Sequence, residues 1–201
     1  WFDLEPGGDL TVVFNTGADP VKMGLVTNLR RPGENVTGVS FFAEELGGKA
    51  LDLFRKEGFA ATSLDDLSAA TGMNRPSLYG AFGDKRELFI KSYQRYREDA
   101  RTAMAGIFRD ELPIRQRLAR IYAVALDIYL SGDSPRGCFT VMTAASEAVS
   151  DPDIRAMVLE GFAELDKAFA ACFRRAREKG ELPASADPAT LAQLASATIH
   201  T

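Results

Sequence analysis

The sequence predicts a mainly α-helical protein that is preceded by a short βαβ-like segment. From residue 43 onward, apolar residues recur at helical spacing between glycine and proline stops. Before that point, residues 10–15 and 36–42 are short runs rich in β-branched side chains, which are typical of strands. The 46% hydrophobic content of the 201 residues is sufficient for a packed core.

Composition sets weak limits on function. The formal net charge of −4, from 24 basic and 28 acidic side chains, argues mildly against a nucleic-acid partner. A DNA-binding protein needs only a local basic surface and helix N-termini at the phosphates, so the distribution of charge decides. The sequence has neither an apolar run of membrane-spanning length nor a secretion signal, and we therefore expect a cytoplasmic protein without a membrane anchor.

The N-terminal segment has the order strand, turn, helix, strand. Residues 10–15 form the first expected strand, residues 21–29 have helical spacing, and residues 36–42 form the second strand. A single βαβ unit does not bury both faces of its strands. We therefore expect this segment to borrow a surface, to dimerise or to stay partly disordered.

A series of helices follows, delimited by Gly, Pro, Asp and Ser residues. Asp187 and Pro188 supply an N-cap and a first-turn proline for the last of them. The apolar stripe of that helix still continues at Thr201, so we expect the helical region to be truncated. The expected helices span residues 43–56, 64–71, 75–82, 84–108, 114–130, 137–149 and 152–179, with the last beginning at 188.

Residues 62–85, TSLDDLSAATGMNRPSLYGAFGDK, have the spacing of a helix-turn-helix. Leu67 faces inward from the first helix, and Gly72 permits the positive φ that a tight turn requires. Leu78 and Phe82 are four residues apart and hold one face of the second helix against the core. The opposite face of the second helix is therefore available for a partner.

That outward face is polar and begins at a capped helix end. In a recognition helix, these positions approach the major groove of DNA. Any α-helical protein can contain two short helices joined by a glycine turn, so the spacing alone leaves a purely structural alternative open. The residues at the tip and on the outward face are Asn74, Arg75, Pro76, Ser77 and Gly80.

The sequence around the helix-turn-helix resembles the TetR family of one-component transcriptional regulators. The matching residues are 50–54 (ALDLF), 57–59 (EGF), 61–63 (ATS) with Leu67, 77–79 (SLY) and 82–85 (FGDK). The resemblance implies a helix-turn-helix DNA-binding domain at residues 43–86 and a helical effector-binding and dimerisation domain at 87–201, after the βαβ-like segment at 1–42. Ala81 departs from the histidine that the family frequently has there.

The resemblance also implies a set of DNA contacts. Arg75 is the best candidate for reading a base, because a bidentate contact with guanine contributes about 1–3 kcal/mol of discrimination. Hydroxyl, phenol and ammonium groups near helix ends are ordinary phosphate partners. The implied phosphate contacts are Thr62, Tyr79 and Lys85, the implied base-edge contacts are Asn74, Arg75, Pro76 and Ser77, and Ser63 belongs to the same DNA-binding set.

For the rest of the chain, the resemblance implies a ligand-responsive repressor that binds a palindromic operator as a homodimer. The implied partners are double-stranded DNA and a small-molecule effector, which shifts helix four and thereby the spacing of the two recognition helices. The family usually dimerises through its last two long helices, so the short helix from Pro188 predicts a weakened dimer. Candidate pocket residues are Tyr122, Leu126, Tyr129, Phe139 and Met142, although core packing is the commoner use of each.

The remaining reactive side chains suggest no cofactor, metal site or enzyme. Cys138 and Cys172 are either redox sensors or, more commonly, small buried hydrophobic residues. His200 is the single histidine, so it offers neither a metal site nor a catalytic triad, and we assign it no role. The basic residues between 174 and 179 are typical of a solvated helix face. Enzyme motifs such as a glycine-rich phosphate loop or HExxH do not occur.

The N-terminal segment resembles a different family, the ABC-type periplasmic solute-binding proteins. Residues 13–21, 24–26 and 31–40 carry this resemblance, and it ends near Phe54. A complete binding protein needs two lobes around a cleft, which about forty residues do not supply. The alternative to a regulator is therefore a non-functional or transport-related fusion fragment, and the sequence leaves open whether the junction is a natural fusion or an artefact.

Overall fold

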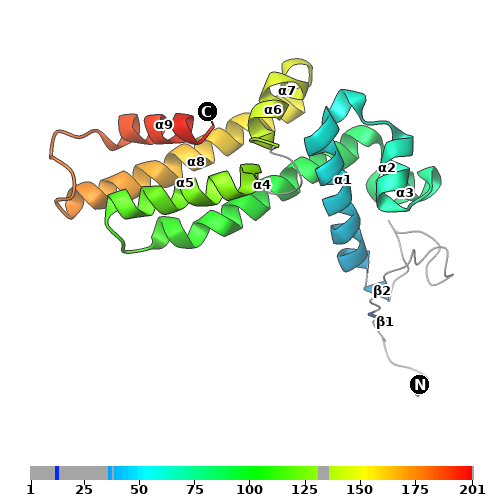
Figure 1. Ribbon diagram of the computed structural model, residues 1–201, viewed down its shortest axis with the longest axis horizontal. Helices are drawn as coiled ribbons and strands as arrows, with labels where there is room; N and C mark the ends of the chain where they lie inside the picture. The colour runs from blue at the N-terminus through cyan, green and yellow to red at the C-terminus, as the bar shows by residue number, and fades with distance from the viewer. Residues whose placement is uncertain (1–11, 14–35, 38, 131–135, 201) are drawn as a thin grey trace. The chain divides into compact units, whose positions relative to one another are not determined.

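A computed structural model describes residues 12–13, 36–37, 39–130 and 136–200. The chain divides into two compact units, Trp1–Ser92 and Tyr93–Thr201. The mainly α-helical fold that the sequence predicts is confirmed (Figure 1). The elements are β1 (Val12–Val13), β2 (Val36–Thr37), α1 (Val39–Ala61), α2 (Leu64–Thr71), α3 (Arg75–Phe82), α4 (Lys85–Arg109), α5 (Ile114–Leu130), α6 (Phe139–Ala145), α7 (Glu147–Ser150), α8 (Pro152–Glu178) and α9 (Pro188–Ile199).

The two strands pair in parallel, with Val12 opposite Val36. The crossover helix expected at residues 21–29 lies outside the described residues. The second strand is shorter than predicted, because α1 already begins at Val39, and the expectation of a strand through residue 42 was wrong. The run VSFF is apolar and suits either structure, since periodicity does not separate a strand from a helix over so few residues.

Aromatic side chains from α1 and α4 form the core of the first unit. Phe54 and Phe89 are fully buried, and their ring centroids lie 5.2 Å apart in an edge-to-face arrangement. Phe59 adds a third ring, 5.2 Å from Phe89. Gly58 interrupts the helical geometry of α1 with φ 78° and ψ 166°, at the stop that the sequence predicts. Residues on both sides of this interruption therefore contribute to one aromatic core.

The ends of α2 and α3 are fixed by local hydrogen bonds. Ser63 and Asp66 form a capping box, in which the Ser63 hydroxyl accepts from the Asp66 N–H at 3.1 Å and the Asp66 carboxylate accepts from the Ser63 N–H at 2.8 Å. Gly72 ends α2 in the left-handed region with φ 71°. Asn74 then caps α3, because its Oδ1 accepts from the Ser77 N–H at 2.9 Å. Both helices have the bounds that the sequence predicts.

Two glycines of this unit should respond in opposite directions to alanine. Gly72→Ala places a side chain at positive φ and should lower the free energy of unfolding by about 1–2 kcal/mol. Gly80→Ala lies inside α3 with open space around the added Cβ, so it should raise that free energy by up to about 1 kcal/mol. Urea denaturation of both variants and of the parent protein checks the pair. Equal effects of the two substitutions would contradict the left-handed turn.

In the second unit, α8 is the helix around which the others pack. It contacts α5, α6, α7 and α9, and Figure 1 shows α8 and α9 side by side. Ile121 of α5 and Phe169 of α8 are fully buried in the core, and Ala192 of α9 joins them. The helices α5, α8 and α9 thus share one apolar centre.

Arg117 and Cys172 form an unusual polar contact inside this second unit. Both side chains are buried, and the Arg117 guanidinium donates to Cys172 Sγ at 3.1 Å and to the Leu112 carbonyl oxygen at 2.6 Å. Neither cysteine of the chain is in a disulfide. The sequence leaves open whether Cys172 is a redox sensor or a small buried residue, and the structure shows that its side chain is buried.

The helix predicted over residues 137–149 is in fact two helices, α6 and α7, and the prediction of one continuous helix was wrong. Ser146 separates them with φ −116° and ψ −88°. Its hydroxyl donates to the Met142 carbonyl oxygen at 2.6 Å, a local bond that competes with helical hydrogen bonding. Because no glycine or proline marks this point, the sequence carried no stop signal there.

Candidate functional site

The α2–α3 pair has an apolar inner side that holds the two helices together. Leu67 of α2 and Leu78 and Phe82 of α3 are buried, and Met73 is buried at the corner between the helices. The burial of Leu67, Leu78 and Phe82 confirms that they face inward, as the sequence predicts. The geometry is that of a helix-turn-helix.

The outer side of α3 is exposed. Asn74, Arg75 and Pro76 are exposed at its N-terminal end, and 46% of the Tyr79 surface is exposed one turn further along. Ser77 is partly buried between them. The structure therefore brings five of the eight expected DNA-contacting residues together on one exposed surface, which we call the α3 surface (Asn74, Arg75, Pro76, Ser77 and Tyr79).

The guanidinium of Arg75 is held by an acidic neighbour. Its Nε lies 3.0 Å from Asp65 Oδ1 and its Nη2 lies 2.7 Å from Asp65 Oδ2, a bidentate pair between two exposed side chains. The hydrogen bonds that Arg75 donates to the Asp65 carboxylate raise the pKa of Arg75 above its ordinary value. The sequence did not identify Asp65 as a partner of Arg75. The two residues are ten positions apart, on different helices, so no local spacing pairs them.

The other expected phosphate contacts differ in how accessible they are. Thr62 is buried, and its hydroxyl donates to the Gly58 carbonyl oxygen at 2.6 Å, so the side chain has no donor left for a phosphate. Ser63 is exposed, but its hydroxyl donates to Asp66 at 2.6 Å. That bond, with the Ser63 N–H, lowers the pKa of Asp66. Lys85 opens α4, and its Nζ lies 4.3 Å from the centroid of the Phe59 ring.

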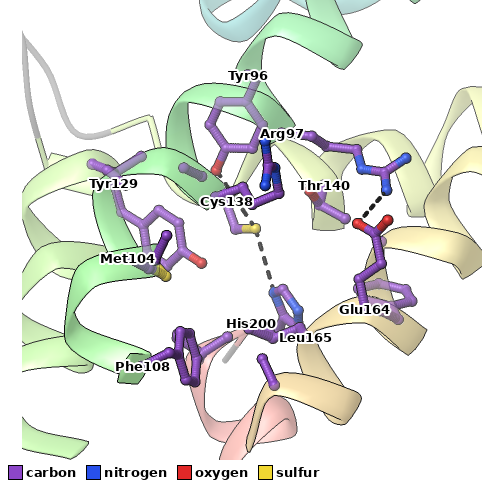
Figure 2. A pocket seen from close by; sticks show the side chains of 18 of the residues that line it. Tyr96, Arg97, Met104, Phe108, Tyr129, Cys138, Thr140, Glu164, Leu165 and His200 are labelled. Atoms are coloured by element: carbon purple, nitrogen blue, oxygen red, sulfur yellow. Dashed lines mark hydrogen bonds and ion pairs between the residues drawn. The ribbon is translucent and has the colours of Figure 1, made fainter. Parts of the chain in front are cut away.

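The second unit contains a cavity of about 520 Å³ lined by α4, α5, α6, α8 and the end of α9. Figure 2 shows its interior. The lining is mostly apolar, with Met104 and Phe108 on one wall and Leu165 on another. Arg97 and Glu164, paired at 2.8 Å, supply charge at its edge. A cavity of this size and polarity is suited to a small organic ligand.

Of the pocket candidates, Tyr129 lines this cavity, and the other four are not among its lining residues. The Tyr122 hydroxyl donates to the Ala195 carbonyl oxygen at 3.3 Å. Phe139 is buried with its ring 5.6 Å from that of Tyr96. Leu126 is 55% exposed, and Met142 is partly buried.

Sequence reasoning missed the polar centre of the cavity. Cys138 and His200 both line it, and Cys138 Sγ lies 3.5 Å from His200 Nδ1. The Tyr96 hydroxyl donates to the same sulfur at 3.9 Å, and Figure 2 shows Cys138 between these two side chains. The thiol and the imidazole are 62 residues apart in the sequence, so no local spacing could have joined them.

The surroundings of Cys138 change the acidity of its thiol. Burial by itself acts to raise the pKa, but the interactions with His200 and Tyr129 outweigh it and lower the pKa of Cys138 to about 7. Burial, together with Cys138, raises the pKa of Tyr129. Near neutral pH, a substantial fraction of this thiol is therefore deprotonated.

Among the described residues, no helix is both long and apolar enough to cross a membrane. The same residues contain no group of three or more His, Cys, Asp or Glu side chains that could hold a metal ion.

Comparison with known proteins identifies the family. The family model described as bacterial regulatory proteins, tetR family, matches residues 48–91, and that of the tetracyclin repressor-like C-terminal domain matches residues 115–201. The HTH-type transcriptional repressor ComR of Escherichia coli (strain K12) is 30% identical over 153 residues, which are 76% of this chain and 73% of ComR.

Solved structures agree with the sequence comparison. The TetR family transcriptional regulator CifR, as a cysteine variant in complex with 26-base-pair double-stranded operator DNA, matches with a TM-score of 0.69 and 25% identity, over 78% of this chain and 82% of that one. Reduced Escherichia coli NemR shares the fold, with a TM-score of 0.70 and 21% identity over 79% of this chain and 82% of that one. The matched family ranges include α2, α3 and most of the second unit, and the chain belongs to the TetR family of bacterial transcriptional regulators.

Proposed function

We propose that this protein is a ligand-responsive transcriptional repressor that binds a palindromic DNA operator as a homodimer. The observation that carries this function is the α3 surface, a polar face on a short helix whose opposite face is fixed in the core. A recognition helix requires this combination, because its side chains must reach base edges while its axis stays in place. The protein acts in the cytoplasm, where the DNA is, as a regulator and not as an enzyme.

Known relatives support this function. ComR and BdcR of Escherichia coli (strain K12) are both HTH-type transcriptional repressors, and BdcR is 30% identical over 120 residues. CifR, at 25% identity, is a TetR family regulator that binds operator DNA. From the similarity to these proteins, we propose that this chain also binds an operator and represses transcription. The segment before residue 48 lies outside the matched family ranges, and its resemblance to solute-binding proteins stays a prediction.

Within the DNA-binding set, we assign different roles to different side chains. Arg75 reads a guanine, and Asn74, Pro76 and Ser77 approach neighbouring base edges. Tyr79, Lys85 and Ser63 contact phosphates and fix the register of the helix. Thr62 keeps a structural role through its bond to Gly58, and only an opening of that bond would let its hydroxyl reach a phosphate.

The effector binds in the cavity of the second unit, between residues 87 and 201. Its volume of about 520 Å³ falls in the range of ordinary small-molecule sites, and its apolar walls carry few polar groups. Tyr129 is the pocket candidate that we retain as a direct contact. Tyr122, Phe139 and Met142 support the cavity from the surrounding helices, and Leu126 lies on the surface.

Exposed leucines on α8 and α9 support homodimerisation. Leu159 of α8 is 59% exposed and Leu194 of α9 is 61% exposed, on two helices that pack against each other. Replacing both leucines by arginine should convert a dimer into a monomer at micromolar concentration, since a buried charge without a partner is strongly destabilising at an interface. Sedimentation velocity checks this change. The double variant Leu126→Arg, Leu130→Arg on exposed α5 positions is the matched control and should stay dimeric.

Selection from a pool of random duplex DNA tests the proposed function. The protein should enrich a palindrome whose half-sites lie about one helical turn apart, roughly 34–36 Å. Binding to the selected DNA should weaken steeply with added salt, because phosphate contacts release counterions. Failure to enrich any sequence at low salt, with the protein folded and dimeric, would exclude operator binding.

A further inference from the structure

We infer that Cys138 is a covalent modification site, at which the cavity captures an apolar carbon electrophile of the α,β-unsaturated carbonyl class. The thiol lines the cavity, and its sulfur is in contact with an imidazole and a phenol that come from distant parts of the chain. The role of this adduct as the effector signal rests on the proposed function, but formation of the adduct does not.

The geometry around the Cys138 sulfur favours removal of the thiol proton. His200 Nδ1 at 3.5 Å is placed to take the thiol proton, and the His200 ring packs edge-on against Phe162 with centroids 4.9 Å apart. Nε2 of His200 is buried and has no hydrogen-bond partner among the described residues. The imidazole is thus held by packing on a nonpolar ring, with one nitrogen directed at the thiol.

The cavity selects the class of reagent that reaches the thiol. Its walls carry Met104, Phe108, Phe162 and Leu165, which favour a reagent with an apolar body. A small polar oxidant gains nothing from such walls. A disulfide would need a second thiol, and Cys172, the other cysteine of the chain, is fully buried against Arg117.

The addition needs no reactant beyond the thiol and the enone. His200 Nδ1 accepts the thiol proton, and the sulfur forms a bond to the β-carbon of the enone as the carbon–carbon π bond breaks. The electron pair moves through the α-carbon to the carbonyl oxygen, and the proton then returns to the α-carbon. The net result is addition of S–H across the double bond, without a leaving group or a change of oxidation state. Tyr96 and Tyr129 line the same cavity and carry hydroxyl donors for the carbonyl oxygen.

The pH dependence of the reaction follows from the groups around the thiol. These are Tyr96 and Arg97 of α4, Tyr129 of α5, Glu164 of α8 and His200 after α9. Because the pKa of Cys138 is lowered to about 7, the thiolate fraction rises through neutral pH and saturates above it. At pH 7 the rate should be about threefold that of an ordinary free thiol, since the larger thiolate fraction is partly offset by weaker nucleophilicity.

The experiment treats the full-length protein with 4-phenylbut-3-en-2-one and follows adducts by intact-mass spectrometry and peptide mapping. We expect one adduct, on Cys138, with a pH–rate inflection near 7. Cys138→Ser should abolish it, and Cys172 serves as the internal control that stays unmodified. His200→Gln should lower the rate at pH 7 at least fivefold and move the inflection upward, a change that loss of packing alone would not produce.

Several results would overturn this site. One is the absence of an adduct while glutathione reacts with the enone under the same conditions, and another is equal labelling of Cys172 in the folded protein. A pH–rate inflection that stays in place in His200→Gln would also overturn it. So would oxidation of Cys138 by an equal concentration of hydrogen peroxide that is faster than its reaction with the enone. A second arm measures binding to the selected operator, which modification should weaken in the parent protein and not in Cys138→Ser. If an adduct forms on a protein that selects no DNA, the proposed function fails while the modification site stands.

Discussion

Arg75→Ala should remove most of the sequence selectivity of this protein. A bidentate arginine–guanine contact contributes about 1–3 kcal/mol of discrimination, so the preference for the selected operator over unrelated duplex should fall about 5- to 150-fold for each half-site. Electrophoretic mobility shifts with operator and with scrambled DNA at the same salt concentration measure both affinities. Arg115→Ala, an exposed arginine on α5, is the matched control and should leave the ratio unchanged.

Asp65 makes this prediction sharper. In the DNA-free protein its carboxylate accepts from two of the guanidinium nitrogens that could donate to a guanine. Asp65→Asn should therefore strengthen binding to scrambled DNA, because a competing negative charge is lost, and lower the selectivity ratio. If Arg75→Ala instead weakens operator and scrambled DNA by the same factor, Arg75 contacts a phosphate and the base-reading role is wrong.

Phe54→Ala should have the largest effect on stability. The ring is fully buried between Phe59 and Phe89, and removing a phenyl ring from such a core lowers the free energy of unfolding by about 3–5 kcal/mol. That loss is a large part of the 5–15 kcal/mol that stabilises an ordinary domain. Guanidinium denaturation followed by circular dichroism measures the change, and DNA binding should fall only as far as the protein unfolds.

Tyr79→Ala is the matched control for Phe54→Ala, since it also truncates an aromatic ring in the same unit. Tyr79 is 46% exposed, so its loss should change the free energy of unfolding by no more than about 0.5 kcal/mol. The affinity of the Tyr79→Ala variant for DNA should nevertheless fall, because the phenol is lost from the α3 surface. Similar denaturation midpoints for the two variants would mean that the Phe54 ring is not the centre of this core.

The sequence predicts those parts of the fold that are set by neighbouring residues. The bounds of α2 and α3 match the predicted ranges because caps and glycines at their ends, such as Ser63, Gly72 and Asn74, act over three or four residues. The break at Ser146 was missed because neither glycine nor proline marks it, and a serine that bonds the carbonyl four residues back can also lie within a helix. The short strand β2 was missed for another reason, since an apolar run as short as VSFF suits a strand or a helix equally.

The candidate sites divide in the same way. Arg75 and Tyr79 could be placed on an exposed face because Leu78 and Phe82 fix the rotation of a single short helix. The burial of Thr62 could not be predicted from the sequence, since it depends on the interruption of α1 at Gly58. The Cys138–His200 contact joins two helices across the second unit, and a solitary histidine gave no local pattern. Sequence patterns identify surfaces on one element, whereas cavities need the packed structure.

The Arg117–Cys172 contact has a practical consequence for fluorescent labelling. An experimenter who wants a single reactive thiol at Cys138 would ordinarily replace the second cysteine by alanine. Here that change would take away the acceptor at 3.1 Å from a buried guanidinium whose Nε already has no partner among the described residues. Serine keeps an acceptor at the same position, so Cys172→Ser is the substitution that leaves the dye attachment site inside an intact bundle.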